Sequence, residues 1–255
     1  MSPNKKEQIS QLLKGIETGD PASVSVVNEA KYIQHNPQTH EGSEGLAELF
    51  KRLSKTSPRV NIVRVFEDGN YVFAHTEYDF ATRNIGFEIF RFEKGQAVEH
   101  WDNIQHRKGP NNSGHSMADG VTKATDHECT ESNRRLIKSF VEDILIQGDL
   151  DKLNDYISQD NYTEHSPDIG DDLTQLKSVL SGSSSGGLAS VEYKKCHQLL
   201  AEGNFVLSVC GGYTKQTYSS FFDLYRIKDG KIVEHWDTTE TIPPRNEWKN
   251  NNGKF

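Results

Sequence analysis

The chain has 255 residues, a formal net charge of -8 and three cysteines. Nucleic acids and anionic membranes bind clustered lysine and arginine, so this composition gives no support for either kind of partner. The cysteines and histidines show no spacing typical of disulfides or zinc sites, so we expect no metal. The amino terminus enters an amphipathic helix without an apolar signal region, and we therefore expect a cytoplasmic protein.

An internal repeat organises the whole sequence. The pentapeptide Val-Glu-His-Trp-Asp stands at residues 98–102 and returns at 233–237, and Tyr-x-x-His-x-Pro stands at 32–37 and 162–167. The separation of matching segments grows from 129 to 135 residues along the chain, as loop insertions in two copies of one unit would produce. We therefore expect two domains, residues 1–118 and 131–255, joined by a linker at 119–130.

Each copy is expected to begin with helices and to continue as a sheet. Apolar residues at helical spacing predict helices around 9–16 and 46–53 in the first copy. Their counterparts lie around 137–144 and 173–180, and a polar loop follows at 181–187. The period then changes to two, and the short connections require antiparallel neighbours, which gives an α+β fold with one sheet face on the helices. The first-copy strands are predicted at 60–67, 71–80, 85–92 and 97–105.

The last hairpin of each copy is predicted to bring ionisable side chains together. A three-residue loop at 228–230 sets Asp223 opposite His235, with Asp237 next on the same face. A two-residue loop would instead move the side chains of one strand to the other face. The first copy repeats the pattern with Glu88, His100 and Asp102.

Aromatic residues are expected on the same sheet face, where Phe90 and Tyr225 alternate with the acids. Apolar walls around a few polar groups are typical of small-molecule pockets, and burial in such walls raises the pKa of a carboxyl group. The alternative to a pocket is a purely structural role, in which the tryptophan packs in the core and the neighbouring histidine and aspartate form an ordinary surface pair. For His35 and His165, a turn-capping role and a pocket role are both open.

Together these segments resemble the SnoaL-like group of bacterial proteins, which are predicted to catalyse aldol condensations. The resemblance implies a nuclear transport factor two-like cone in each half, in which a curved sheet wraps round helices and leaves a pocket. It departs from the group at Glu88, where an aspartate is usual. In the second copy Gln34, Asn36 and Gln105 are replaced by Glu164, Ser166 and Glu240. The segments that carry the resemblance are 32–37, 86–91, 99–102, 222–226 and 232–237.

Polyketide cyclases of this type use an aspartate as the acid and base of an intramolecular aldol closure, without metal or cofactor. By motif position, the resemblance gives this role to Asp102 and Asp237. Our first hypothesis is a cofactor-independent enzyme that removes a proton next to a carbonyl in a small hydrophobic substrate. The alternative is a non-catalytic module that binds a small ligand or a protein partner, and the fold alone does not decide between them. The candidate catalytic residues are His35, Glu88, His100, Asp102, His165, Asp223, His235 and Asp237, and the candidate substrate-binding residues are Tyr32, Phe90, Tyr162 and Tyr225.

The duplication also predicts how the halves assemble. Single-copy members of this superfold commonly pair through the sheet face away from the helices, and such a contact uses the same patch twice. A tandem chain already holds two such patches joined by a linker. We therefore expect an intramolecular pseudo-dimer, with the tryptophan-bearing or adjacent sheet faces in contact, and a chain that is monomeric in solution.

Overall fold

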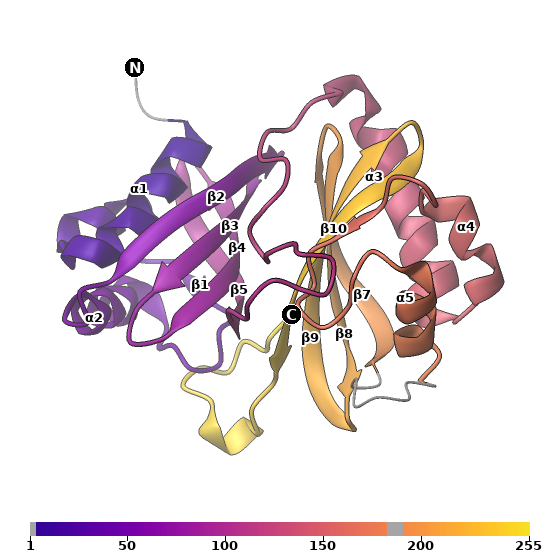
Figure 1. Cartoon of the computed structure of the whole chain (residues 1–255). Helices are drawn as coiled ribbons and strands as arrows, with labels where there is room; N and C mark the ends of the chain where they lie inside the picture. The colour runs from indigo at the N-terminus through magenta and orange to yellow at the C-terminus, as the bar shows by residue number, and fades with distance from the viewer. Residues whose placement is uncertain (1–3, 183–190) are drawn as a thin grey trace. The chain divides into compact units, whose positions relative to one another are not determined.

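The structure is a computed structural model that describes residues 4–182 and 191–255. Most of the polar loop expected at 181–187 lies outside these ranges. The chain divides into two compact units, Met1–Arg107 with Ile242–Phe255, and Lys108–Thr241. Each unit holds a five-stranded sheet with helices (Figure 1), which confirms the α+β class for both copies. No helix in the described parts of the chain is both long and apolar enough to cross a membrane.

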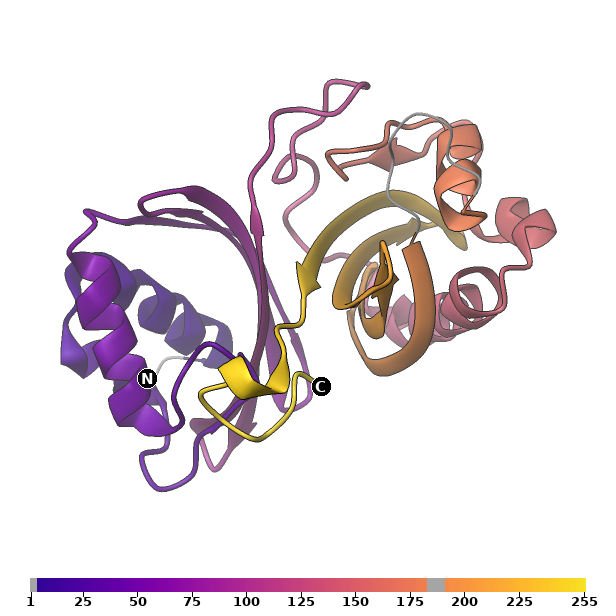
Figure 2. The same cartoon turned by 90° about the horizontal axis from the view of Figure 1, so that it is seen from below.

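The first unit wraps a mixed sheet round its helices, as the curved strands at the indigo end of the colour bar show in Figure 2. The strand order is β1-β5-β4-β3-β2, in which β1 runs parallel to β5 and the other neighbours are antiparallel. The strands predicted from the period of two are confirmed. The elements in chain order are α1 (Lys5–Thr18), the 3-10 helix η1 (Pro21–Val26), β1 (Ile33–Gln34), α2 (Gly42–Ser54), β2 (Arg59–Asp68), β3 (Tyr71–Asp79), β4 (Arg83–Glu93), β5 (Gln96–His106) and the 3-10 helix η5 (Arg245–Glu247).

The helices of the first unit form where the apolar spacing predicts them. Ile9, Leu12 and Ile16 of α1 are buried in the core between the helices and the sheet. The side chain of Asn4 accepts a hydrogen bond from a first-turn N–H, and Gly19 ends the helix with a φ of 66°. Glycine adopts this left-handed conformation at little cost, so Gly19 serves as the C-cap of α1.

The second unit repeats the order of the first. Its sheet runs β6-β10-β9-β8-β7, with β6 parallel to β10. One difference lies at its first helix, which continues as a π-helical segment, so the stripe predicted around 137–144 spans two elements. The elements are η2 (His127–Cys129), α3 (Thr130–Phe140), η3 (Val141–Ile146), η4 (Leu150–Lys152), α4 (Leu153–Tyr156), β6 (Thr163–Glu164), α5 (Leu173–Leu180), β7 (Val191–Glu202), β8 (Phe205–Thr214), β9 (Thr217–Lys228) and β10 (Lys231–Thr241).

The structure corrects the predicted partners in the last hairpin. The β9–β10 loop has two residues rather than three, because Lys228 pairs with Lys231. A bulge at Val233 then adds one residue to β10, so Asp223 lies opposite Asp237 and not opposite His235. The two one-residue shifts add to two residues, and because strand side chains alternate, both acids and the histidine still share one face. The first copy does the same, and its Glu88 lies opposite Asp102.

The tails that follow the two sheets are exchanged. The segment after β5 belongs to the second unit, and the segment after β10 belongs to the first. Asn250 Nδ2 donates to the backbone carbonyls of Asn36 and Thr39, and Asn111 does the same for the equivalent loop of the second copy. The tails therefore satisfy buried carbonyl groups of the opposite copy. The compact units differ for this reason from the expected division into 1–118, 119–130 and 131–255.

Candidate functional site

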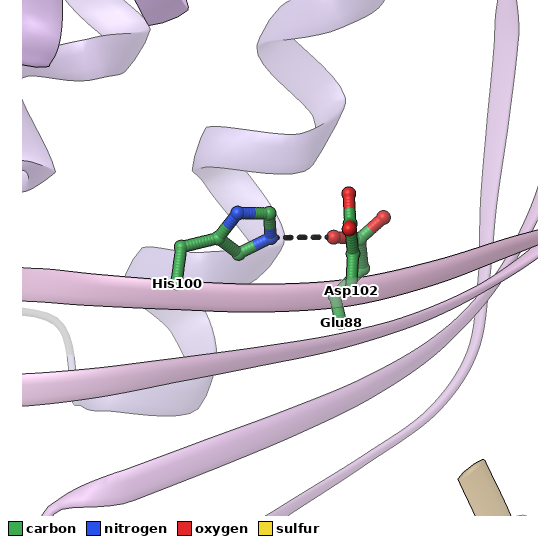
Figure 3. Close-up of side chains that lie close together, drawn as sticks. All are labelled: Glu88, His100 and Asp102. Carbon is green, nitrogen blue, oxygen red and sulfur yellow. Dashed lines mark hydrogen bonds and ion pairs between the residues drawn. The ribbon is translucent and has the colours of Figure 1, made fainter. Parts of the chain in front are cut away.

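Three ionisable side chains meet on the helix-facing side of the first sheet. Glu88 comes from β4, whereas His100 and Asp102 come from β5, two residues apart and so on one face. One ligand atom of each lies within 4.8 Å of the others, and all three residues are buried. His100 Nε2 lies 2.7 Å from Glu88 Oε2 (Figure 3). The structure thus brings together the trio that the hairpin of the first copy predicted.

Neighbouring polar groups hold this trio in place. Tyr78 OH donates to Glu88 Oε1 at 2.6 Å, and His100 Nδ1 lies 2.9 Å from Gln34 Oε1. The same Gln34 oxygen accepts from the backbone N–H of Asn36, which identifies it as an acceptor. Both ring nitrogens of His100 therefore lie within hydrogen-bond distance of side-chain oxygens, which fixes the orientation of the ring.

Asp102 has one carboxylate oxygen without a hydrogen bond. Its Oδ2 accepts from Asn36 Nδ2 at 2.8 Å. Its Oδ1 is buried, and no hydrogen-bond donor reaches it from the described residues, although Lys254 Nζ lies 3.7 Å away. A buried acceptor without a donor costs free energy, so Oδ1 is the atom of the trio best placed to bond a ligand.

An apolar cavity of about 190 Å³ lies over the trio, and Tyr32 forms part of its wall. The Tyr32 side chain is buried, and its hydroxyl has no hydrogen-bond partner within the described ranges. Burial, followed by the charges of Glu88 and Asp102, raises the pKa of Tyr32 well above its usual value, so the hydroxyl keeps its proton. The apolar wall consists of Leu12, Leu13, Ile16, Leu46, Leu49, Phe50, Leu53, Phe80, Phe90 and Ile104.

The trio has the spacing of a metal site, but most of its oxygens are already occupied. Of the four carboxylate oxygens of Glu88 and Asp102, three accept hydrogen bonds from Tyr78, His100 and Asn36. A cation bound here would have to displace these donors and would face the Lys254 ammonium group. The donor set therefore suits proton transfer better than metal coordination.

The loop histidine of the first copy is not part of the trio. His35 stacks on Trp101 with ring centroids 4.7 Å apart, and its Nε2 lies 2.9 Å from Glu99 Oε1. Its Nδ1 lies 2.8 Å from the backbone oxygen of Gly253. Glu99 and Trp101 occupy the sheet face opposite to His100, because strand side chains alternate. The placement of His35 therefore fits the turn-capping role and not the pocket role.

The second unit has a corresponding trio, Asp223, His235 and Asp237, whose hydrogen-bond partners differ from those of the first. His235 lies between two carboxylates, with Nδ1 2.8 Å from Glu164 Oε1 and Nε2 3.2 Å from Asp223 Oδ1. Burial lowers the pKa of His235, but Glu164 and Asp223 outweigh it and hold that pKa well above its usual value. Burial raises the pKa of Asp237 to about 7, a rise that His235 opposes and that Glu164 and Asp223 increase.

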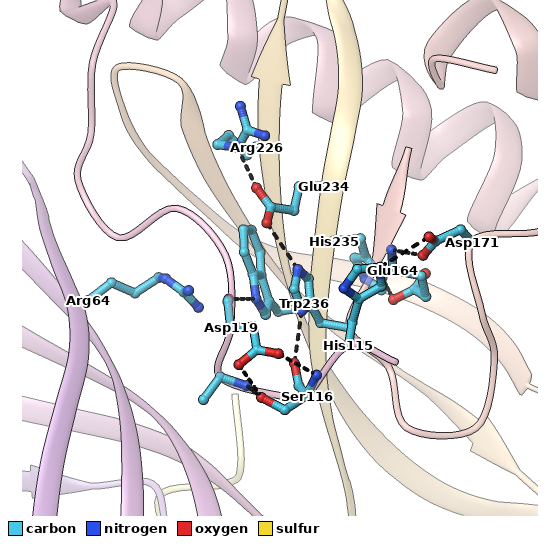
Figure 4. A network of polar contacts seen from close by, with 12 residues as sticks. Arg64, His115, Ser116, Asp119, Glu164, Asp171, Arg226, Glu234, His235 and Trp236 are labelled. Atoms are coloured by element: carbon cyan, nitrogen blue, oxygen red, sulfur yellow. Dashed lines mark hydrogen bonds and ion pairs between the residues drawn. The ribbon is translucent and has the colours of Figure 1, made fainter. Parts of the chain in front are cut away.

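The other face of the second sheet is drawn in Figure 4. His165 stacks on Trp236 with centroids 4.7 Å apart, and its Nε2 lies 3.0 Å from Glu234 Oε1. Its Nδ1 lies 2.8 Å from the backbone oxygen of Ser116, and Trp236 Nε1 donates to that of Asp119 at 2.9 Å. His165 thus repeats the position of His35 and is not part of the second trio.

The cavity beside the second trio is much smaller, at about 40 Å³. Tyr162 and Tyr225 line it, together with Asp223 and His235. Among the described residues, Asp237 does not belong to its wall. The second trio therefore lacks a space for a ligand comparable to the one over the first trio.

An exchange of large and small residues explains the difference in volume. In the first copy, Gly86 of β4 leaves room for Tyr78 of β3, since a Cβ on Gly86 would lie 2.4 Å from Tyr78 Cε2. The corresponding residues of the second copy are Phe221 and Gly212. Phe221 packs on Tyr193 with centroids 4.6 Å apart, and together they fill the space over the second trio.

Four contributors to the first site were not singled out from the sequence. Gln34 and Asn36 flank His35 in the Tyr-x-x-His-x-Pro motif, and they lie on the cavity side with Tyr32 because β1 is extended. A period of two across this motif could have shown them. No signal in the sequence pointed to Tyr78 or to Lys254. The hydrogen bond from Lys254 to Asp102 joins residues that are 152 positions apart in the sequence.

Residues 9–100 match the family model described as a SnoaL-like domain. The second unit repeats the strand order of the first, which fits a tandem duplication. No curated protein matches the chain.

Several solved structures are similar to one copy at a time. TsrD from Streptomyces laurentii is 20% identical, with 40% of this chain and 92% of that chain covered and a TM-score of 0.35. IdmH from Streptomyces antibioticus, described as a candidate polyketide cyclase, is 14% identical, with 39% and 90% covered and a TM-score of 0.34. An LEH-like epoxide hydrolase from M. tuberculosis is 16% identical, with 39% and 81% covered and a TM-score of 0.34.

Proposed function

We propose that the first unit is a cofactor-independent acid/base enzyme that acts on a small hydrophobic carbonyl compound, by aldol cyclisation or isomerisation. The observation that carries this proposal is the Asp102 carboxylate, which lines an apolar cavity and has a buried oxygen that no donor from the described residues reaches. A positioned base of this kind accelerates proton abstraction by roughly 10²- to 10⁴-fold.

In the proposed reaction, Asp102 removes a proton from the carbon next to the substrate carbonyl, and the C–H electron pair forms the enolate. The Tyr32 hydroxyl donates a hydrogen bond to the enolate oxygen. In an aldol closure the enolate carbon attacks a second carbonyl, and Asp102 returns the proton to the new alkoxide. In an isomerisation the proton returns to a different carbon. His100 has both ring nitrogens bonded, so it positions Glu88 and Gln34 and makes no direct bond to the substrate.

We further propose that the second unit has a structural role and does not turn over substrate. The cavity of about 40 Å³ and the position of Asp237 outside its wall support this view. A cytoplasmic location remains part of the proposal, because a reducing compartment suits the three free thiols, Cys129, Cys196 and Cys210.

Recovery of the natural ligand tests this function. The whole chain is purified under native conditions, and the small molecules released on denaturation are identified by mass spectrometry. We expect a hydrophobic carbonyl compound from the wild type and a strongly reduced amount from Gly86→Phe, which fills the first cavity, but not from the control Gly109→Ala, which has open space around it. Incubation with fresh protein should convert the compound to a product. A compound that is bound but never converted would favour the non-catalytic alternative.

A further inference from the structure

The last residues of the chain lie beside the first trio. Asn252 Nδ2 donates to the backbone oxygen of Gln34 at 3.1 Å, and the backbone oxygen of Gly253 bonds His35. The next residue is Lys254, whose side chain is only 2% exposed. Lysine is seldom buried unless it is paired, so the position calls for a partner.

Lys254 contacts Asp102 at two points. Its Nζ donates to the backbone oxygen of Asp102 at 2.6 Å and lies 3.7 Å from Oδ1 of the same residue. That carbonyl lies on the edge of β5 just beyond β1, whose pairing ends at His100. The ammonium group thus satisfies an edge carbonyl and places positive charge next to the Asp102 oxygen that has no hydrogen-bond donor within the described ranges.

The second copy supplies an internal comparison. The tail residue that corresponds to Lys254 is His115, and its Nε2 lies 3.2 Å from Asp171 Oδ2. The positive group that acts on Asp237 is His235, and burial still raises the pKa of Asp237 to about 7. The two copies therefore share the aspartate and differ in the tail residue at this position, Lys254 in one and His115 in the other.

We propose that Lys254 is a positioning residue, through which the tail of the second copy completes the acid/base site of the first by holding Asp102 in place and setting a positive charge beside its carboxylate. This inference rests on the proposed role of Asp102. Lys254 does not line the cavity in the described structure, so it acts through Asp102 and not on the substrate. The working site then needs segments from both copies, although only one cavity is used.

The other titratable groups that face Asp102 are few. Glu88 and His100 share its sheet face, Tyr32 and Tyr78 lie beside it, and Arg52 of α2 lines the same cavity. Burial, followed by the charge of Glu88, raises the pKa of both tyrosines well above the usual value, so they stay protonated near neutral pH. The ionisable surroundings of Asp102 thus include Glu88, His100, Arg52 and Lys254, and the variants below change only Lys254.

The test uses the full chain labelled with ¹³C at the aspartate carboxyl carbon, with Asp102 assigned by the signal that Asp102→Asn removes. In Lys254→Met, the pH at which this signal changes from carboxylate to carboxylic acid should rise by about one unit or more, because a nearby opposite charge is lost. Lys254→Arg should keep the wild-type transition, and so should Lys249→Met, which removes an exposed lysine of the same tail. An unchanged transition in Lys254→Met would overturn the proposal.

A second measurement covers the case in which Lys254→Met does not fold, as judged by loss of the dispersed spectrum. In the wild type, the ¹⁵Nζ signal of Lys254, assigned with Lys254→Arg, should show slow hydrogen exchange with water. The chemical shift of this signal should change in Asp102→Asn and stay the same in Asp237→Asn. A signal that exchanges fast with water and has the same chemical shift in Asp102→Asn would refute the role of Lys254. Neither measurement uses a substrate, so an inactive protein would refute the proposed function and leave these outcomes readable.

Discussion

One substitution within a shared motif changes the electrostatics of the two copies. His100 lies between the amide of Gln34 and a carboxylate, whereas His235 lies between the carboxylates of Glu164 and Asp223. The extra carboxylate of the second copy holds the proton on His235 and adds to the rise in the pKa of Asp237. The same pentapeptide therefore supports two different arrangements of charge.

The raised pKa of Asp237 predicts a stability that falls as pH rises. In the unfolded chain an aspartate has a pKa of about 3.9, whereas the folded value is about 7. Between these values the folded state holds a proton that the unfolded state has lost, so the free energy of unfolding decreases from about pH 4 to about pH 7. Asp237→Asn removes this loss, and we expect it to stabilise the protein at pH 8 by on the order of 1–4 kcal/mol and to have little effect near pH 4.

Urea unfolding at pH 4, 6 and 8 measures this effect. Asp229→Asn, in the exposed β9–β10 turn, is the matched control and should be neutral throughout. His235 acts in the same direction as Asp237, because its raised pKa stabilises the fold at low pH and this contribution is lost as pH rises through the folded value. If Asp237→Asn instead lowered the free energy of unfolding at pH 8, the Asp237 carboxylate would be stabilised by a partner, and the prediction would be wrong.

At the level of elements, the residues where β3 pairs with β4 set the size of the cavity over the first trio. Gly86→Ala places a Cβ 2.4 Å from Tyr78 Cε2 and 2.6 Å from Thr76 Oγ1. Tyr78 must then move away from Glu88, and we expect a loss of about 1–3 kcal/mol in unfolding free energy together with weaker ligand retention. Denaturant unfolding of Gly86→Ala against Gly109→Ala checks this, and equal stability of the two would contradict it.

The sequence predicts the elements well because their signals are local. The apolar stripes of α1 and α2 and the strands of both sheets follow from helical and two-residue periods. The face shared by Glu88, His100 and Asp102 was predicted correctly, although the loop length and the partner of each residue were wrong, because a bulge leaves no clear mark in the sequence. The contribution of Lys254 could not be predicted, since only the folded chain brings it to β5.

At the scale of the whole molecule, the tail that follows each sheet belongs to the compact unit of the other copy. Residues 121–123, which precede the second-copy helices, are exposed and offer a place to insert a protease site. After cleavage there, each fragment still carries a tail that belongs to the other unit. We expect the fragments to elute as one species of unchanged size in gel filtration, and the uncut chain to be monomeric, as the pseudo-dimer hypothesis requires.

A control with the same protease site adds Asn111→Ala and Asn250→Ala, which remove the bonds between each tail and the carbonyls of the opposite loop. This variant should separate more readily after cleavage. Fragments that part without denaturant in the parent chain would show that the tails do not hold the units.

We propose that Asp102, and not Asp237, performs proton transfer. The most direct measurement incubates the recovered ligand with protein in deuterium oxide and follows incorporation of deuterium next to the carbonyl by mass spectrometry. We predict rapid incorporation with the wild type and with Asp237→Asn, and a rate lower by roughly 10²- to 10⁴-fold with Asp102→Asn. Wild-type incorporation by Asp102→Asn, or a loss confined to Asp237→Asn, would contradict the assignment of the working site to the first copy.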